Sequence, residues 1–594
     1  MHARVLAVLQ QPRLRAAAAV AACVLLLALI VDRIDPALPW PPKLDALSLI
    51  FANTMPVLIA WLLAFALTRR LWFACWLTAL AVVGLYAANE AKIAHLEAPL
   101  LPGDLRLLAE PGPALNLLGR YVAFDLRIVA LAALGLLVSA WLYRRRATWR
   151  LAGWRRTALA AAAVLLGLSL VAGAGPWRRL YDADRLGFEP WALSESTQRI
   201  GLIGILLLYH WELGSGDVPA ADRDAAIALL RRHAEPLRER LRAAPPAHEL
   251  PDIVVLQSES LFDPARLRGV AEGRFLGGLR DLAARASAGE MRVPTFGGGT
   301  IRTEFEVLTG APLASLGGVQ YPWLELRDAR LPGLVSTLAA RGYDTVAVHP
   351  NAAGFWNRRK AYAQLGFERF VDSREFPPDA IVGLFTSDAA LTDRVLDELA
   401  DAGAPRFVFA ISMENHGPYD WRPGLDPVRY HALPLPARLD ETGRFWLANY
   451  LYLLDDADHE LMRLVGALHQ RTRRTVLLFY GDHLPALQPV YEQLGFDDGR
   501  EAKEQSVPWL IYDTADATPR RADTQSWLLP AQLLKSAGVE DDYFLVVEAL
   551  RELLDLGSEA PADDIGHALR SLARAHLRGE FADLLAAALS EREL

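Results

Sequence analysis

The sequence predicts an α-helical membrane domain of five transmembrane helices, followed by an α/β domain outside the cytoplasm. Apolar stretches gather in the first third of the chain, basic residues flank them unequally, and short apolar runs alternate with amphipathic stretches after residue 250. At 594 residues the chain is too long for one ordinary globular domain. We therefore expect a five-helix membrane domain at 1–176, a juxtamembrane interfacial helix and linker at 177–250, and an outer domain at 251–594.

The five predicted spans are apolar stretches between charged flanks. A membrane-spanning helix needs about 17–25 apolar residues. The first and fourth stretches are slightly short, so Arg15 and Arg144 would have to reach toward the interface. A cleavable signal peptide is the alternative for the first stretch, but Asp32 and Arg33 follow it without a small-residue cleavage site. The stretches are 16–31, 46–68, 71–89, 128–143 and 157–176.

Basic residues predict how these spans are oriented. Arginines precede the first span and occupy the loops between the second and third and between the fourth and fifth, whereas the other two loops are richer in acidic residues. The positive-inside rule then places the N-terminus in the cytoplasm, and an odd number of spans places everything after Trp177 outside. The apolar stretch 201–213 is short for a crossing, so we expect an interfacial helix there. A sixth span is the alternative and would return the outer domain to the cytoplasm.

Cysteine and charge content narrow the class of protein. Cys23 and Cys75 both lie within predicted spans, so the outer domain has no disulfide and depends on its own apolar core. The formal net charge is -8, and no basic footprint for a nucleic acid is present.

The outer domain shows strand–helix alternation. Amphipathic helical patterns at 331–341 and 389–402 separate β-rich apolar runs, which predicts a largely parallel sheet covered by helices. In such sheets ligands collect at the carboxyl ends of the strands. The predicted strands are 253–256, 345–348, 407–411, 476–480 and 509–512.

Three short segments place metal-ligating groups directly after predicted strands or glycines. Glu259 lies in VVLQSES (254–260), Thr300 follows three glycines, and Asp482 and His483 follow VLLFYG. Two carboxylates, an imidazole and a hydroxyl suit Zn²⁺ or Mn²⁺, and such a cation would activate Thr300 as a nucleophile. The alternatives are that Thr300 only caps a helix, that Thr303 is the nucleophile, and that Asp482 only caps a turn.

Two further segments carry groups suited to a phosphorylated substrate. VHPNAAGFWNRRKAY (348–362) contains His349, Trp356 and Arg358, and ISMENHGPYD (411–420) contains His416. An arginine guanidinium can bind two phosphate oxygens at once, and tryptophan can form the wall of a headgroup pocket. Histidine can donate a proton to a leaving group. Taken singly, each could be a surface charge or a buried structural histidine.

In this order, after five spans, the motifs resemble the membrane-anchored lipoteichoic acid synthase and phosphoglycerol transferase family of the alkaline phosphatase/sulfatase superfamily. The matching strings are FWNR, GDH and the T-x-x-[ST]-E-F pattern at Thr300, all within 250–485. The resemblance implies a sulfatase-like α/β fold and one metal site, usually Mn²⁺ with Zn²⁺ or Mg²⁺ as alternatives. Its implied ligands are Glu259, Thr300, Asp482 and His483, and its implied phosphoglycerol-binding residues are His349, Trp356, Arg358 and His416.

The resemblance also implies an activity. A multi-pass protein of the bacterial inner membrane would move glycerophosphate from phosphatidylglycerol to a hydroxyl acceptor, a glycan or polyglycerolphosphate, through a covalent intermediate on Thr300. His416 would shuttle the proton. The contexts GGGTIR and NHGPY differ from the Gram-positive synthases and leave the acceptor open.

Three alternatives remain for this activity. A phosphoethanolamine transferase shares the topology, but those relatives typically carry disulfides in the outer domain. A sulfatase-like hydrolase would need a C/S-x-P-x-R motif, which the outer domain lacks. A binding-only membrane sensor would have lost a metal ligand, and all four are present.

Overall fold

The structure of the protein is a computed structural model. It describes residues 12–35, 47–96, 99–102, 126–145, 153–188, 193–212, 216–243, 249–317, 319–326, 330–400, 403–559 and 561–590. The chain forms two compact units, one of residues 1–214 with 354–357 and one of residues 215–353 with 358–594.

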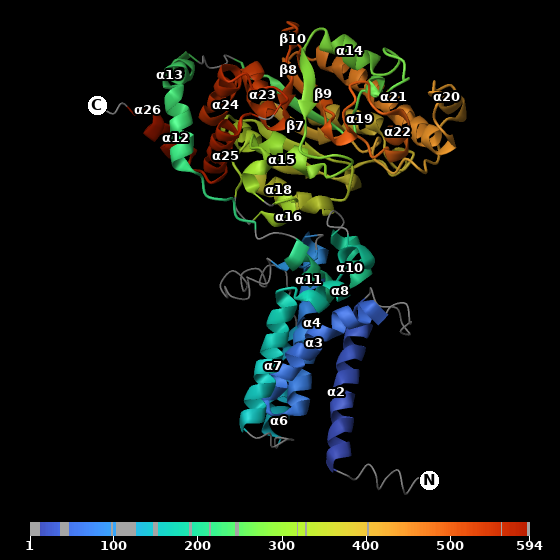
Figure 1. The fold of residues 1–594 in the computed structure, drawn as a ribbon, viewed down its shortest axis with the longest axis vertical. Helices are drawn as coiled ribbons and strands as arrows, with labels where there is room; N and C mark the ends of the chain where they lie inside the picture. Colours follow the sequence, from blue (N-terminus) through green and yellow to red (C-terminus); the bar gives the residue numbers. More distant parts are fainter. Residues whose placement is uncertain are drawn as a thin grey trace. The chain divides into compact units, whose positions relative to one another are not determined.

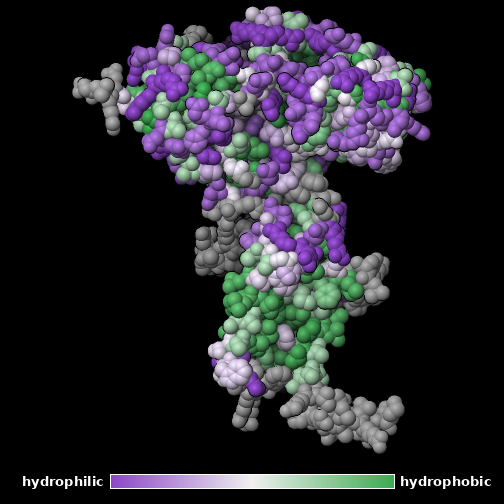
Figure 2. Space-filling view, in the orientation of Figure 1, coloured by the Kyte–Doolittle hydropathy of each residue, from purple (hydrophilic) through white to green (hydrophobic). Residues whose placement is uncertain are grey.

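Helices occupy all five predicted spans of the first unit (Figure 1). Three of them, α3 (Leu47–Thr68), α4 (Leu71–Leu96) and α7 (Gly153–Val171), are long and apolar enough to cross a membrane. The other two, α2 (Pro12–Ile34) and α6 (Leu126–Arg144), contain shorter apolar helical segments at 16–32 and 130–144. The helices are coated by apolar side chains (Figure 2). The described chain thus holds three candidate spans, and the expectation of five is not confirmed.

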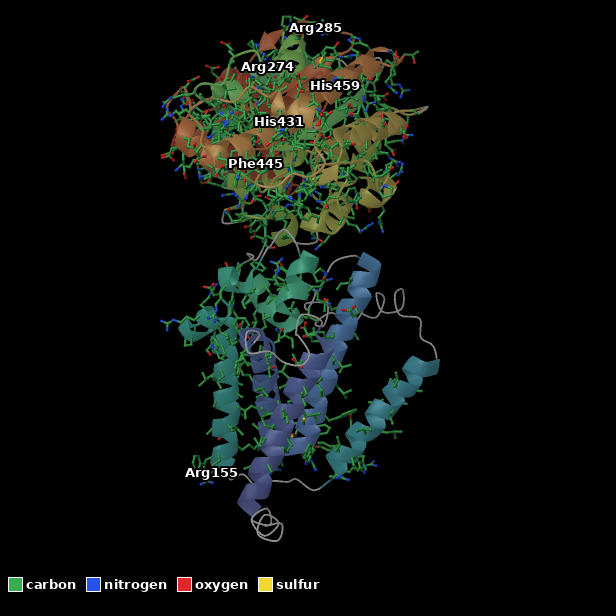
Figure 3. The ribbon with its side chains drawn as sticks, turned by 90° about the vertical axis from the view of Figure 1, so that its right-hand side faces the viewer. Arg155, Arg274, Arg285, His431, Phe445 and His459 are labelled. Atoms are coloured by element: carbon green, nitrogen blue, oxygen red, sulfur yellow. The ribbon has the colours of Figure 1, made fainter. Side chains whose placement is uncertain are left out.

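Arginines gather at one end of this helix bundle. Arg156, near the start of α7 next to Arg155 (Figure 3), donates to the carbonyl oxygens of Ala66 and Leu67 at the end of α3, at 3.0 and 3.1 Å. Arg70, at the start of α4, donates to the carbonyl of Arg145 at the end of α6. The helix ends that flank two of the predicted cytoplasmic loops therefore lie close together. The orientation of that end toward the cytoplasm stays a prediction.

The apolar stretch after the fifth helix forms α11 (Leu202–Glu212), which follows the short helices α8 (Gly175–Leu180), α9 (Ala183–Leu186) and α10 (Leu193–Ile200). Its 11 residues extend about 16 Å, roughly half the thickness of a bilayer core. Side chains of the first unit bind its N-terminus, because Leu202 N donates to Asp35 and Gly204 N to Asn53, both at 2.9 Å. This length rules out α11 as a sixth span.

The second unit is built on a nine-stranded sheet in the order β10-β2-β9-β8-β1-β7-β3-β4, with β11 paired to β2. The five strands from β8 to β4 are parallel, whereas β9 runs antiparallel to both β8 and β2. All five predicted strands are present. The strands are β1 (Asp252–Ser258), β2 (Ser287–Arg292), β3 (Asp344–Val348), β4 (Arg369–Val371), β7 (Arg406–Ile411), β8 (Thr475–Gly481), β9 (Val507–Asp513), β10 (Arg520–Arg521) and β11 (Thr524–Gln525).

Helices pack on this sheet, and a separate small hairpin pairs β5 (Ile381–Val382) with β6 (Phe385–Thr386). The predicted helices at 331–341 and 389–402 are present as α17 (Leu334–Ala340) and α19 (Asp388–Glu398). The charged stretch 222–242, predicted to be helical within the connector at 177–250, forms α12 (Arg223–Arg232) and α13 (Ala234–Ala243), which pack on α24 to α26 within this unit. The other helices are α14 (Gly277–Ala283), α15 (Ile301–Thr309), α16 (Pro322–Glu325), α18 (Arg358–Leu365), α20 (Pro427–His431), α21 (Glu441–His469), α22 (Gln488–Leu494), α23 (Leu529–Ala537), α24 (Asp542–Leu553), α25 (Asp563–Leu577) and α26 (Phe581–Leu589).

Candidate active site and metal centre

Strand order brings together residues that lie far apart in the sequence. The adjacent parallel strands β8, β1, β7 and β3 end just before Asp482, Glu259, Ser412 and His349 respectively. The register pairs Ser258 with Gly481, so the next residues of β1 and β8 emerge side by side. This edge is where a parallel sheet collects functional groups.

Glu259, Asp482 and His483 form a buried cluster whose ligand atoms all lie within 4.8 Å of one another. His483 Nε2 is 3.4 Å from Glu259 Oε1 and 3.4 Å from Asp482 Oδ2. Burial, together with the Glu259 charge, raises the pKa of Asp482 to about 7. Burial also disfavours the charged form of His483, but Asp482 and Glu259 outweigh it and raise the pKa of the imidazole. Two buried carboxylates facing one imidazole nitrogen require a cation or a proton between them.

The remaining contacts of these groups fit a divalent cation. Asp482 Oδ1 accepts from the backbone N–H groups of Ser260 and His483, both at 2.8 Å. His483 Nδ1 donates to the Leu484 carbonyl at 2.9 Å, which directs Nε2 into the cluster. Asp482 Oδ2 and His483 Nε2 are buried without a hydrogen-bond partner in the part of the chain that the structure describes. Two carboxylates and an imidazole are ligands that suit Zn²⁺ and Mn²⁺.

Thr300 directs its hydroxyl at this cluster. It precedes α15 and follows Gly297, Gly298 and Gly299, whose φ angles of 65°, 143° and 76° lie where side chains are strained. Its side chain makes no capping bond to α15, so the capping alternative is wrong for the hydroxyl. Instead Oγ1 donates to Glu259 Oε2 at 3.3 Å, and the residue is only 6% exposed.

Thr303 has a different position. Its hydroxyl is fully buried and donates to the backbone carbonyl of Asp482 at 2.7 Å. That contact ties α15 to the strand end that carries Asp482. The Thr303 hydroxyl therefore makes a structural contact and is not exposed.

Arg358 and His349 form a second buried pair beside α15. Arg358 is 1% exposed, and its Nη2 and Nε lie 2.8 and 3.1 Å from Glu304 Oε2. Its Nη1 donates to His349 Nε2 at 3.1 Å, and His349 Nδ1 donates to the Ile411 carbonyl at 3.4 Å. Burial and the Arg358 charge lower the pKa of His349 well below its ordinary value. His349 is therefore neutral, and both its ring nitrogens are engaged.

His416 lies in the loop after β7. Its Nδ1 donates to the carbonyl of Gly417 at 2.7 Å, which leaves Nε2 as the nitrogen that can exchange a proton. The Phe385 ring meets the imidazole edge-on, with centroids 5.1 Å apart. Burial opposes ionisation of Glu259, but the charges of His416 and His483 outweigh it and lower the pKa of that carboxyl. His416 thus belongs to the same electrostatic environment as the metal cluster.

Trp356 is the one predicted site residue that does not belong to the second unit. It lies in a short 3-10 helix, Phe355–Asn357, with a φ of 56°, and residues 354–357 group with the first unit. Its substrate-binding role stays a prediction.

Sequence reasoning missed several residues that hold this site in place. Ser260 Oγ donates to Glu259 Oε1 at 2.9 Å, and the Glu259 backbone N–H donates to Ser412 Oγ at 2.9 Å. Glu304 could have been found, because it is the acidic residue of the T-x-x-[ST]-E-F pattern. Ser260 and Ser412 carry no comparable signal, since their roles depend on which strands are neighbours.

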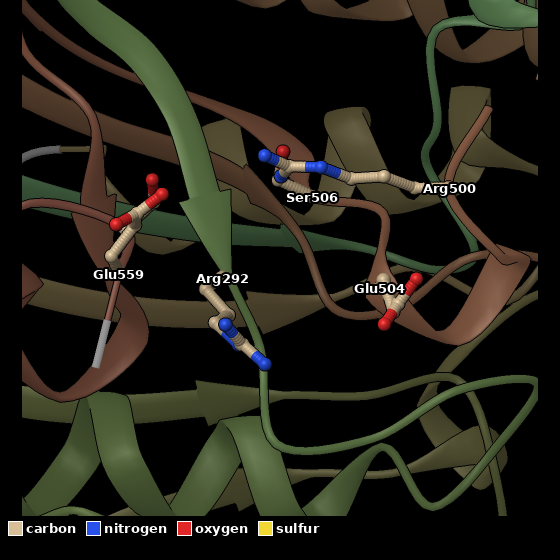
Figure 4. A pocket seen from close by; sticks show the side chains of 6 residues that line it. Arg292, Arg500, Glu504, Ser506 and Glu559 are labelled. Carbon is tan, nitrogen blue, oxygen red and sulfur yellow. The ribbon is translucent and has the colours of Figure 1, made fainter. Parts of the chain in front are cut away.

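A cavity of about 370 Å³ lies elsewhere in the second unit, around Arg292 at the end of β2 (Figure 4). Arg292 and Arg500 line it together with Glu504, Ser506, Ser558 and Glu559. None of the predicted site residues lines this cavity, so the cavity is separate from the candidate active site.

Residues 251–539 match the sulfatase family. A Rhizobium meliloti protein named for cyclic β-1,2-glucan modification is 29% identical over 372 residues, which cover 61% of this chain and 56% of that protein. The capsular polysaccharide biosynthesis protein RkpI of the same organism is 29% identical over 482 residues, covering 76% of this chain and 80% of that protein.

Among solved structures, the Streptococcus pyogenes phosphoglycerol transferase GacH, in complex with sn-glycerol-1-phosphate, has a similar fold. The match has a TM-score of 0.52 and 21% identity, and it covers 62% of this chain and 98% of that structure. At this identity the likeness shows the fold alone.

Proposed function

We propose that this protein, whose residues 251–539 match the sulfatase family, transfers phosphoglycerol from phosphatidylglycerol to a hydroxyl acceptor. One observation carries the proposal: the Thr300 hydroxyl is 3.3 Å from Glu259, within the cluster that Asp482 and His483 complete. A hydroxyl so placed is suited to nucleophilic attack.

Glu259, Asp482 and His483 would hold a divalent cation, with Thr300 as the fourth ligand. When bound, the cation supplies Lewis acidity that lowers the pKa of a neighbouring hydroxyl. Mn²⁺ is the cation we propose, with Zn²⁺ or Mg²⁺ as alternatives.

The reaction has two steps. In the first, the Thr300 oxygen forms a bond to phosphorus while the bond from phosphorus to the diacylglycerol oxygen breaks. The Thr300 proton leaves toward Glu259 Oε2, which already accepts it in a hydrogen bond. His416 Nε2 donates a proton to the leaving diacylglycerol, because Nδ1 is held by the Gly417 carbonyl.

In the second step an acceptor hydroxyl attacks the phosphorus of the glycerophosphoryl group on Thr300 and gives its proton to His416. The bond from phosphorus to the Thr300 oxygen breaks, and Thr300 regains a proton from Glu259. Arg358 orients the transferred group through its guanidinium, which Glu304 and His349 hold in one rotamer.

The acceptor we propose is a glycan hydroxyl of the cell envelope, with polyglycerolphosphate as the alternative. The two relatives named for glucan modification and capsular polysaccharide support a glycan. The apolar helices of the first unit support a lipid donor, since a membrane anchor keeps the site near headgroups.

Mass spectrometry of the Thr300 peptide tests the proposal. Purified protein is incubated with Mn²⁺ and a mixture of phosphatidylglycerol and phosphatidylethanolamine, beside Thr300→Ala. Thr303→Val is the matched control, because it removes a hydroxyl of the same helix that contacts only backbone. We expect a glycerophosphate adduct on the Thr300 peptide in the parent and in Thr303→Val, and none in Thr300→Ala.

Other results would identify the alternatives. A phosphoethanolamine adduct would make the protein a phosphoethanolamine transferase. An unmodified Thr300 without diacylglycerol release would contradict the transferase and favour a sulfatase-like hydrolase or a binding-only protein.

A further inference from the structure

Arg422, in the loop that also carries His416, is a buried arginine without a hydrogen-bonding partner among the residues that the structure describes. It is 8% exposed, and Nε, Nη1 and Nη2 are all buried without such a partner in the described part of the chain. An arginine stays charged, and its planar fork offers five donors. A buried charge that is neither paired nor hydrogen-bonded is costly, so this side chain calls for an anionic partner.

Two aromatic rings hold the guanidinium. Its central carbon lies 5.4 Å from the centroid of Phe385 and 5.7 Å from that of Tyr419. Such contacts stabilise the cation but use none of its directional N–H donors. The nearby Glu414 makes no hydrogen bond to Arg422: its Oε2 accepts from Asp388 N at 2.6 Å, and its Oε1 is buried without a hydrogen-bond partner among the described residues. Burial and the Asp388 charge also raise the pKa of Glu414 to about 10, which makes it neutral.

The same two rings connect Arg422 to the candidate active site. Phe385 meets the His416 imidazole with centroids 5.1 Å apart, and the Tyr419 hydroxyl donates to the Asn415 carbonyl at 2.7 Å. Asn415 in turn donates to the Glu259 carbonyl at 3.3 Å. Arg422 and His416 therefore contact the same Phe385 ring.

We propose that Arg422 is an anion-binding residue of this site, which takes a phosphate oxyanion beside His416. The proposal rests on the phosphoglycerol transfer argued above and deepens it. The phosphate could belong to the donor lipid, and so to the transferred group, or to an acceptor that already carries phosphoglycerol. Both offer the same chemistry, a singly charged phosphate diester that matches the guanidinium fork.

The hairpin of β5 and β6 packs against Arg422. These strands of two residues each pair only with one another among the described strands. Gly383, at their turn, has a φ of 64°, and a Cβ there would lie 3.1 Å from Arg422 Cδ.

Calorimetry with sn-glycerol phosphate tests the proposal on the full chain in detergent. All proteins carry Thr300→Ala, so that no turnover occurs and the result does not depend on Thr300 chemistry. Arg422→Gln should bind glycerol phosphate at least ten-fold more weakly or lose one bound equivalent. Arg429→Gln is the matched control, because that arginine is paired with Asp455 and Asp456. It should bind like its parent.

Thermal unfolding separates binding from a structural role. Because the Arg422 guanidinium makes no hydrogen bond within the described chain, Arg422→Gln should leave Tm unchanged or raise it. A lowered Tm with unchanged affinity and stoichiometry would overturn the proposal, and so would unchanged binding at an unchanged Tm.

Diacylglycerol release from phosphatidylglycerol, measured with Thr300 intact, identifies the source of the phosphate. A donor phosphate predicts that Arg422→Gln slows release at least ten-fold. An acceptor phosphate predicts unchanged release and loss of the second equivalent of glycerol phosphate. If Thr300 forms no adduct at all while Arg422→Gln still weakens binding, the transferase fails and the anion site stands.

Discussion

Glu304 illustrates how one buried residue can determine the position of another. It is fully buried, accepts two hydrogen bonds from Arg358 on Oε2, and accepts a third from Trp323 Nε1 on Oε1 at 3.1 Å. Without its charge the Arg358 guanidinium would be buried and uncompensated. Removing one partner of such a pair is far more costly than exchanging the pair for apolar side chains.

We therefore predict that Glu304→Gln lowers the free energy of unfolding by about 3–5 kcal/mol. Glu375→Gln is the matched control, because it removes one carboxylate from an ion pair with Arg369 whose side chains are 47% and 38% exposed. An exposed pair contributes only about 0–1 kcal/mol. Chemical denaturation of the full chain measures both, and equal effects of the two substitutions would contradict the role given to Glu304.

At the residue scale the sequence could predict the residue types but not every contact. Glu259, Thr300, Asp482 and His483 were predicted from strand ends and glycines, and the structure brings them together. The sequence could not decide between Thr300 and Thr303. The structure does, because the Thr300 hydroxyl contacts Glu259 whereas the Thr303 hydroxyl contacts the backbone of Asp482.

The helix α15 is the element that links Thr300 to the core. One side of it carries Glu306, which is buried and accepts from Ser526 Oγ and from Leu313 N. Burial raises the pKa of Glu306 from 4.5 to about 7, so the folded state favours the neutral acid. The raised pKa of Glu306 contributes to the stability of the folded state. This contribution is fully present below pH 4.5 and is lost as the pH rises through 7.

We predict that Glu306 makes the free energy of unfolding depend on pH, and that Glu306→Gln removes this contribution. Between pH 4.5 and 7 the folded state binds a proton that the unfolded state has released, which lowers stability by roughly 1.4 kcal/mol for each pH unit. Above pH 7 the variant, which carries no charge, should therefore be more stable than the parent. Urea denaturation at pH 5 and pH 8 checks this, and a parent-to-variant difference that is equal at both pH values would refute it.

The parallel strands are the elements that assemble the site. Their existence follows from short β-rich apolar runs, and all five predicted runs are strands. Their order does not follow from the sequence, because β1 lies between β7 and β8, which come about 150 and 220 residues later. Only that order places Glu259 between the loop of His416 and Asp482.

For the whole molecule, orientation in the membrane is the decisive prediction. Arg144, at the end of α6, should face the cytoplasm, and the exposed Glu501 of the second unit should face the outside. A membrane-impermeant maleimide should therefore label Glu501→Cys in intact cells and label Arg144→Cys only after permeabilisation. The native thiols, Cys23 and Cys75, are buried and provide a low background. Labelling of Arg144→Cys but not of Glu501→Cys in intact cells would show the opposite orientation and contradict this prediction.

By itself the sequence determined the class of fold, the helical first part, the five strands and the ligand types, because these depend on local hydropathy, periodicity and residue chemistry. The tertiary structure decided which strands are neighbours, that Glu304 neutralises Arg358, and that Arg422 is buried without a hydrogen bond in the described chain. Those facts depend on contacts between residues distant in sequence, which no local pattern encodes.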